Sequence, residues 1–212
     1  VTGVQTCALP ICSALIFRPG REYNRSREFG NDRSEFTNFT EDRKKMFDRL
    51  IALLKSGEPR KLVFTEGHDA RILEAAARLK REGILTPILI GKVETVRAKA
   101  AEGGFDIDGL EILDPETYPE MDAMVARMVE LRKGKMTADD CRANLRKGNY
   151  FGTMLVKMGY ADALLGGATY STADTVRPAL QLVKTKPGAH LVSSCFILVR
   201  GEEKLAMGDC AI

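Results

Sequence analysis

Short apolar runs alternate with segments of helical periodicity between residues 46 and 187. The clearest runs, KLVFT and TPILI, are apolar at successive positions, which is typical of strands buried on both faces. The sequence therefore predicts an α/β fold with a parallel sheet flanked by helices on both faces. The predicted strands are 61–65, 86–91, 110–113 and 161–165, and the predicted helices are 46–57, 70–82, 93–101, 120–132, 137 onward and 149–158.

The chain changes character after residue 185. Two strand-like runs, 190–199 and 204–210, flank the sequence Arg200-Gly201-Glu202-Glu203, which has the length of a hairpin turn. We therefore divide the chain into a first α/β domain at 46–187 and the start of a second, truncated domain at 188–212.

Charge and composition exclude several classes of function. The net charge is +3 with no basic face, so nucleic acid is not an expected partner. No apolar run reaches the roughly 20 residues that cross a bilayer, so no membrane association is expected. Five scattered cysteines without a CxxC pair, and only two histidines, give no zinc motif and fit reduced thiols in a cytoplasmic protein.

The first 45 residues differ from the rest. Residues 1–11 (VTGVQTCALPI) resemble a translated sequencing adapter, and 12–45 are polar and arginine-rich without helix or strand periodicity. We favour an artefact upstream of a native start at Met46, and the other interpretation is a genuine disordered arm. No function is placed there.

The segment 166–178 has the strongest chemical pattern. Small residues follow a strand and lead through hydroxyl side chains into a helix, where Ser171, Thr172 and Arg177 are candidate ligands for a phosphate. The alternative is a well-capped helix, with Ser171 and Asp174 as a capping box and Arg177 in solvent. The chain has neither a P-loop nor a GxGxxG fingerprint.

Other polar residues are weaker evidence for a functional site. The cations of 131–135 end a helix, where the helix dipole alone accounts for them. His68 is expected at a surface turn, and Cys195 and Cys210 are expected to be core thiols because no neighbouring group would lower their pKa values.

Several motifs occur in one order along the chain: KLVFTEG, LRKGK, YFGTM, GATYSTADTVRP and VSS. In this order, from about Met46 to the last residue, the chain resembles the phosphate acetyl/butyryltransferase family. The resemblance implies an isocitrate/isopropylmalate dehydrogenase-like fold. It also implies transfer of an acetyl group between coenzyme A and inorganic phosphate, in a protein that is a homodimer when full length.

The resemblance also implies roles for particular residues. Arg132 and Arg177 match arginines that bind coenzyme A or the phosphoryl substrate, and Ser171 and Thr172 match hydroxyls that face the cleft. Tyr170 stands where the family usually has His, so no imidazole is available there. Coenzyme A is a substrate, and no metal or further cofactor is expected.

The catalytic residues are expected outside this chain. In the family, a later segment brings a Ser-Arg motif and an acidic residue to the cleft, so we expect these 212 residues alone to be inactive. Two other functions stay open at this point: a phosphate butyryltransferase, and the acyl-CoA-binding regulatory domain of a malic enzyme. A non-enzymatic anion-binding domain is what the chemistry supports without the resemblance.

Overall fold

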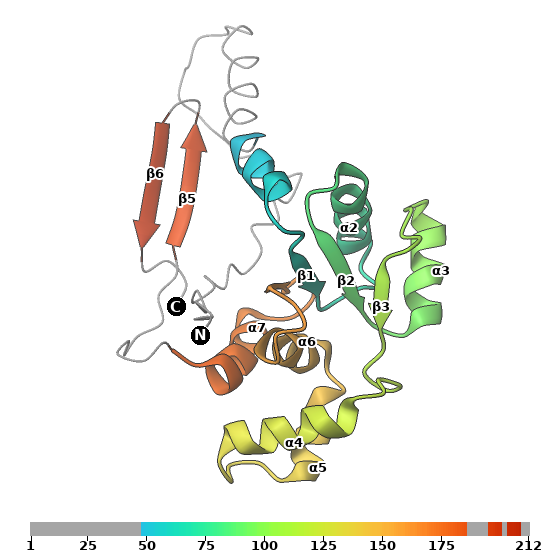
Figure 1. Ribbon diagram of the computed structural model, residues 1–212, viewed down its shortest axis with the longest axis vertical. Helices are drawn as coiled ribbons and strands as arrows, with labels where there is room; N and C mark the ends of the chain where they lie inside the picture. The colour runs from blue at the N-terminus through green and yellow to red at the C-terminus, as the bar shows by residue number, and fades with distance from the viewer. Residues whose placement is uncertain (1–47, 186–194, 201–202, 209–212) are drawn as a thin grey trace, which may run out of the picture.

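The structure is a computed structural model that describes residues 48–185, 195–200 and 203–208 (Figure 1). Its centre is a parallel four-stranded sheet with the order β3-β2-β1-β4, which confirms the predicted parallel sheet. The strands are β1 (Lys61–Phe64), β2 (Thr86–Ile90), β3 (Glu111–Leu113) and β4 (Ala163–Leu165).

Helices cover both faces of this sheet, as the apolar strands predict (Figure 1). One core cluster packs Phe64 and Leu89 against α2 and α3, and the other packs Val63 and Ile88 against α4, α5 and α6. The helices are α2 (Ala70–Glu82), α3 (Val93–Gly103), α4 (Met121–Arg132), α5 (Ala138–Leu145), α6 (Gly148–Lys157) and α7 (Thr172–Pro178), preceded by a helix at 48–56.

Local signals set several helix ends where the sequence places them. The Asp69 side chain accepts a hydrogen bond from the Arg71 N–H and caps α2, and Gly83 ends that helix with a left-handed φ of 61°. The predicted capping box of Thr137 and Asp140 opens α5, with both reciprocal hydrogen bonds present.

One element departs from the expected pattern. After Pro178 the chain continues as a π-helix, η1 (Ala179–Val183), closed by the Lys184 N–H on the Ala179 carbonyl. Pro178 has no N–H to donate to the carbonyl of Asp174, four residues earlier. That carbonyl accepts instead from the Asn149 side-chain amide at 2.7 Å, so a residue of α6 satisfies the group that proline leaves open.

The later strands form a separate antiparallel pair, β5 (Cys195–Arg200) and β6 (Glu203–Gly208), which confirms the predicted hairpin within the described residues (Figure 1). Residues 190–194 and 209–210 of the predicted strands, and the segment 1–45, lie outside those residues. None of the helices in the described ranges is both long and apolar enough to span a bilayer.

Candidate functional site

The strand order places a candidate site between β1 and β4. From β1 the chain steps outward to β2 and β3, and then returns to the other side of β1 as β4. The helix crossovers diverge at this point, and in open parallel sheets ligands bind at such a switch point, beyond the carboxyl ends of the strands. The turn 65–69 follows β1 here, and the loop 166–170 follows β4.

Close packing brings α6 to the same edge. A β-carbon at Gly148, in the first turn of α6, would overlap the Thr65 carbonyl, and one at Gly166 would crowd the Thr65 hydroxyl. Glycine at these two positions lets the helix and the loop approach the end of β1.

Glu66 is the most highly bonded side chain at this edge. It is 1% exposed, and its carboxylate accepts hydrogen bonds from the backbone N–H groups of residues 167–170. The distances are 2.9 Å from Gly167, 3.0 Å from Ala168 and 2.8 Å from Tyr170, and the Thr169 hydroxyl adds a bond of 2.7 Å. Successive N–H groups that converge in this way form an anion-binding concavity.

Two opposing effects set the ionisation of Glu66. Burial on its own would raise its pKa, because burial disfavours the charged form. The hydrogen bonds from Thr169, Tyr170 and Ala168 together outweigh burial and lower the pKa below its ordinary value. Glu66 is therefore an ionised internal anion at neutral pH and is not poised to act as a base.

This arrangement adds to the sequence interpretation, which places candidate phosphate ligands at Ser171, Thr172 and Arg177. In the loop just before them, the backbone N–H groups of residues 167–170 are occupied by Glu66. The sequence does not single out Glu66. The available signal is an acidic residue directly after a buried strand, facing a glycine-rich loop after another strand.

Ser171 and Thr172 lie at the start of α7, as expected. The Ser171 hydroxyl accepts from the Asp174 N–H at 3.1 Å, which confirms Ser171 as the cap of α7. The Asp174 carboxylate accepts from that hydroxyl at 2.7 Å and not from the Ser171 backbone N–H, so the predicted capping box is not completed. Thr172 is exposed beside it. Arg177 is also exposed and forms an ion pair with Asp174 at 3.6 Å.

Arg132 lies at the end of α4, against η1. Its Nη1 donates to the Gln181 carbonyl at 3.4 Å, and its Nε is buried without a partner among the described residues. The Tyr150 hydroxyl donates to the Gln181 side chain at 3.0 Å. Burial raises the pKa of Tyr150, and the charges of Arg177 and Arg132 oppose that shift.

The Arg132 guanidinium and the Tyr150 hydroxyl both bond to Gln181, and the charges of Arg132 and Arg177, which are 45 positions apart in the chain, both act on Tyr150. An arginine with an unused Nε and an exposed arginine nearby suit a phosphate or diphosphate group. Two further residues belong to this site: Tyr150, which lies in the motif YFGTM but has no role assigned from it, and Gln181, which no motif contains and whose placement depends on the π-helix.

Tyr170, which replaces the family's His, has a structural contact. The backbone N–H groups of Asn149 and Gly148, in the first turn of α6, lower the pKa of its phenol. Burial and the Glu66 carboxylate raise its pKa, and those N–H groups only partly offset them. Tyr170 therefore stays a neutral phenol, in agreement with the expectation that no group at this position titrates near neutral pH.

Two remaining expectations concern residues away from this edge. His68 is exposed in the turn after β1, as predicted for a surface residue. Cys210 lies outside the described residues, as does the side chain of Cys195.

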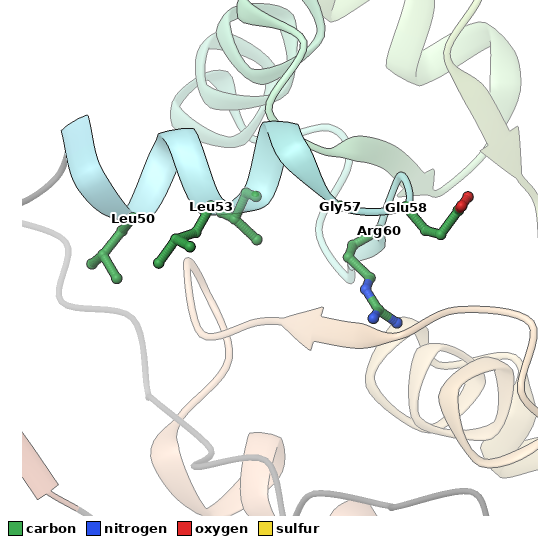
Figure 2. Close-up of a pocket in the computed structure, with 6 residues that line it drawn as sticks. Leu50, Leu53, Gly57, Glu58 and Arg60 are labelled. Carbon is green, nitrogen blue, oxygen red and sulfur yellow. The ribbon is translucent and has the colours of Figure 1, made fainter.

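A hollow of about 440 Å³ lies along the helix at 48–56, away from the candidate residues (Figure 2). Its apolar lining includes Leu50 and Leu53, which are 48% and 62% exposed. The charged Arg60 at its end is already paired with Asp162 at 2.9 Å. The hollow is lined by Leu50, Leu53, Leu54, Gly57, Glu58 and Arg60. No set of polar groups converges there, so we place the candidate site at the β1–β4 edge.

The fold and site define an α/β protein with an anion-binding edge at the switch point of a parallel sheet. The family model described as phosphate acetyl/butaryl transferase matches residues 46–212. The chain belongs to this phosphate acetyl/butyryltransferase family, as its motifs indicate.

Individual relatives agree with the family. The chain is 50% identical over 157 residues to the phosphate acetyltransferase of Bacillus subtilis, covering 74% of this chain and 49% of that protein. It is 44% identical over 166 residues to the phosphate acetyltransferase of Staphylococcus epidermidis, covering 77% and 50%. The chain thus spans about half the length of the curated relatives it matches.

Solved structures show the same likeness. A phosphotransacetylase from Streptococcus pyogenes superposes with a TM-score of 0.75 at 46% identity, over 80% of this chain and 52% of that one. The EutD phosphotransacetylase from Staphylococcus aureus gives a TM-score of 0.70 at 40% identity, over 84% and 51%.

Proposed function

We propose that this chain supplies the phosphate-binding side of a phosphate acetyltransferase, which converts acetyl-CoA and inorganic phosphate to coenzyme A and acetyl phosphate, reversibly. The observation that carries the proposal is the cluster at Gln181, whose carbonyl accepts from Arg132 and whose side chain accepts from the Tyr150 hydroxyl, with the charges of Arg132 and Arg177 both acting on Tyr150. The names of the relatives at 44% and 50% identity supply the reaction.

In the thioester-forming direction, the thiolate of coenzyme A attacks the carbonyl carbon of acetyl phosphate. A C–S bond forms, the bond from that carbon to the phosphate oxygen breaks, and inorganic phosphate leaves with the electron pair. Arg132 and Arg177 supply positive charge for phosphate groups at this site, both those of coenzyme A and the phosphate that leaves. Ser171 caps α7 and fixes the start of that helix, and the exposed Thr172 hydroxyl beside it helps to orient the same ligand.

The general base has to come from elsewhere in the whole protein. A free thiol with a pKa of about 8.5 is mostly protonated at neutral pH, so a base assists thiolate formation. Glu66 is ionised, but its carboxylate is occupied by hydrogen bonds from the loop 167–170 and from the Thr65 hydroxyl, and Tyr170 is a neutral phenol. We therefore expect this chain alone to bind coenzyme A without forming the thioester.

The same proposal includes further expectations about the architecture, assembly and location of the protein. These are the isocitrate/isopropylmalate dehydrogenase-like architecture, a second domain that begins at 188–212, a homodimer, and a cytoplasmic location. Coenzyme A and phosphate are its substrates, with no metal or other cofactor. Acetyl is proposed over butyryl as the acyl group because the similar proteins reported above are acetyltransferases by name.

Calorimetric titration of the 212-residue chain with coenzyme A tests the binding role. We expect saturable binding that Arg177→Gln weakens by about tenfold or more, because charge-assisted hydrogen bonds to a phosphate are lost. Arg78→Gln is the matched control, since Arg78 is an exposed residue of α2 paired with Glu82. No binding by the wild-type chain, or equal weakening by both variants, would contradict the proposal.

A further inference from the structure

Glu66 fills a concavity that is built for an anion. The carboxylate receives four successive N–H groups from residues 167–170 as well as the Thr169 hydroxyl, and it is 1% exposed. Glu66 and Thr169, which form one of these contacts, are 103 positions apart in the chain. The loop after β4 is therefore fixed to the end of β1 through one side chain.

The same loop leads directly into the candidate ligand-binding residues. Tyr170 donates its N–H to Glu66 at 2.8 Å, and the next residue, Ser171, begins the cap of α7. Arg71 attaches the same loop at a second point, because its Nη2 donates a hydrogen bond to the Ala168 carbonyl at 2.8 Å. The position of Ser171, Thr172 and Arg177 thus depends on a loop whose main attachment is Glu66.

We propose that Glu66 is a positioning residue, an internal anion that sets the loop 167–170 and through it the ligand-binding residues 171–177. The ligand-binding part of this inference rests on the function proposed above. Because the carboxylate occupies the concavity, a substrate phosphate is kept out of it and is bound by the arginines instead.

Chemical rescue of Glu66→Ala tests this inference. Truncation at the β-carbon removes a CH₂–COO⁻ group, which acetate matches in size and charge. Acetate is expected to raise the melting temperature of Glu66→Ala in a saturable way, by several degrees, because a ligand that binds only the folded state stabilises it. Acetamide, the neutral isostere, is expected to have no such effect, and neither wild type nor Glu74→Ala, an exposed control on α2, should respond to acetate.

Coenzyme A affinity is the second measurement. Glu66→Ala is expected to bind coenzyme A on the order of tenfold more weakly than wild type, and acetate should restore part of the loss. If Glu66→Ala is not recovered folded, its refolding yield in acetate against acetamide replaces the melting temperature.

The inference is overturned if acetate and acetamide act alike on Glu66→Ala, or if acetate restores stability while coenzyme A affinity never changed. Failure of the wild-type chain to bind coenzyme A would count against the proposed function. In that case a selective response to acetate would still support the role of Glu66 in fixing the loop.

Discussion

At the carboxyl edge of the sheet, Glu66 takes up backbone donors that a ligand would otherwise use. Its carboxylate accepts from the N–H groups of the loop after β4. The donors that remain for a phosphate are side chains, above all Arg132 and Arg177. At the scale of single residues, the edge is therefore already organised before a ligand arrives.

The lowered pKa of Glu66 predicts a pH-dependent contribution to stability. A carboxyl whose folded-state pKa is lowered stabilises the fold above its ordinary value of 4.5, and the contribution is lost as pH falls through the folded-state pKa. Glu66→Gln should therefore lower the free energy of unfolding by about 2 kcal/mol at neutral pH, the scale of charged hydrogen bonds. The difference from wild type should shrink as pH falls below 4.5.

Urea unfolding at a series of pH values measures this difference, with Glu74→Gln on the exposed face of α2 as the control. If the difference in free energy of unfolding between Glu66→Gln and wild type stays constant through the acid range, the charge of Glu66 does not contribute to stability.

Among the helices, α6 and α7 depend on each other through one hydrogen bond. Asn149 of α6 donates to the Asp174 carbonyl that Pro178 leaves without a helical partner. Asn149→Ala should lower the free energy of unfolding by about 1–3 kcal/mol, because the carbonyl then lacks a donor. In a Pro178→Ala background the loss should be smaller, since residue 178 regains an N–H.

A double-mutant cycle of Asn149→Ala and Pro178→Ala measures this coupling by urea unfolding. Additive effects of the two substitutions would show that the Asn149 amide does not compensate for the proline.

The elements also show how far the sequence predicts the structure. The ends of α2 and α5 follow from Asp69, Gly83 and Thr137, whose caps are local and readable as short patterns. Two features could not be predicted from the sequence. One is the contact of Glu66 with the loop after β4, and the other is the π-helix after Pro178. Both depend on which strands and helices become neighbours, and contacts between residues 103 positions apart (Glu66 and Thr169) or 25 apart (Asn149 and Asp174) leave no local signal in the sequence.

For the molecule as a whole, the sheet order explains why distant motifs form one site. The return of the chain to β4 beside β1 places the segment 166–178 next to the turn after β1, and α4 and α6 add Arg132 and Tyr150. The candidate residues Arg132, Ser171, Thr172 and Arg177 were predicted from motif order. Their arrangement around Tyr150 required the fold.

The reaction itself is the most direct test of the account. The complete protein that carries this chain would be given acetyl phosphate and coenzyme A, and acetyl-CoA formation would be followed for wild type and for Arg132→Gln with Arg177→Gln. We predict acetyl-CoA formation by wild type, and a loss in the double variant of about a hundredfold or more, as expected for removing two charged contacts to the leaving phosphate. A complete protein that binds coenzyme A but forms no acetyl-CoA, or a double variant as active as wild type, would contradict the account.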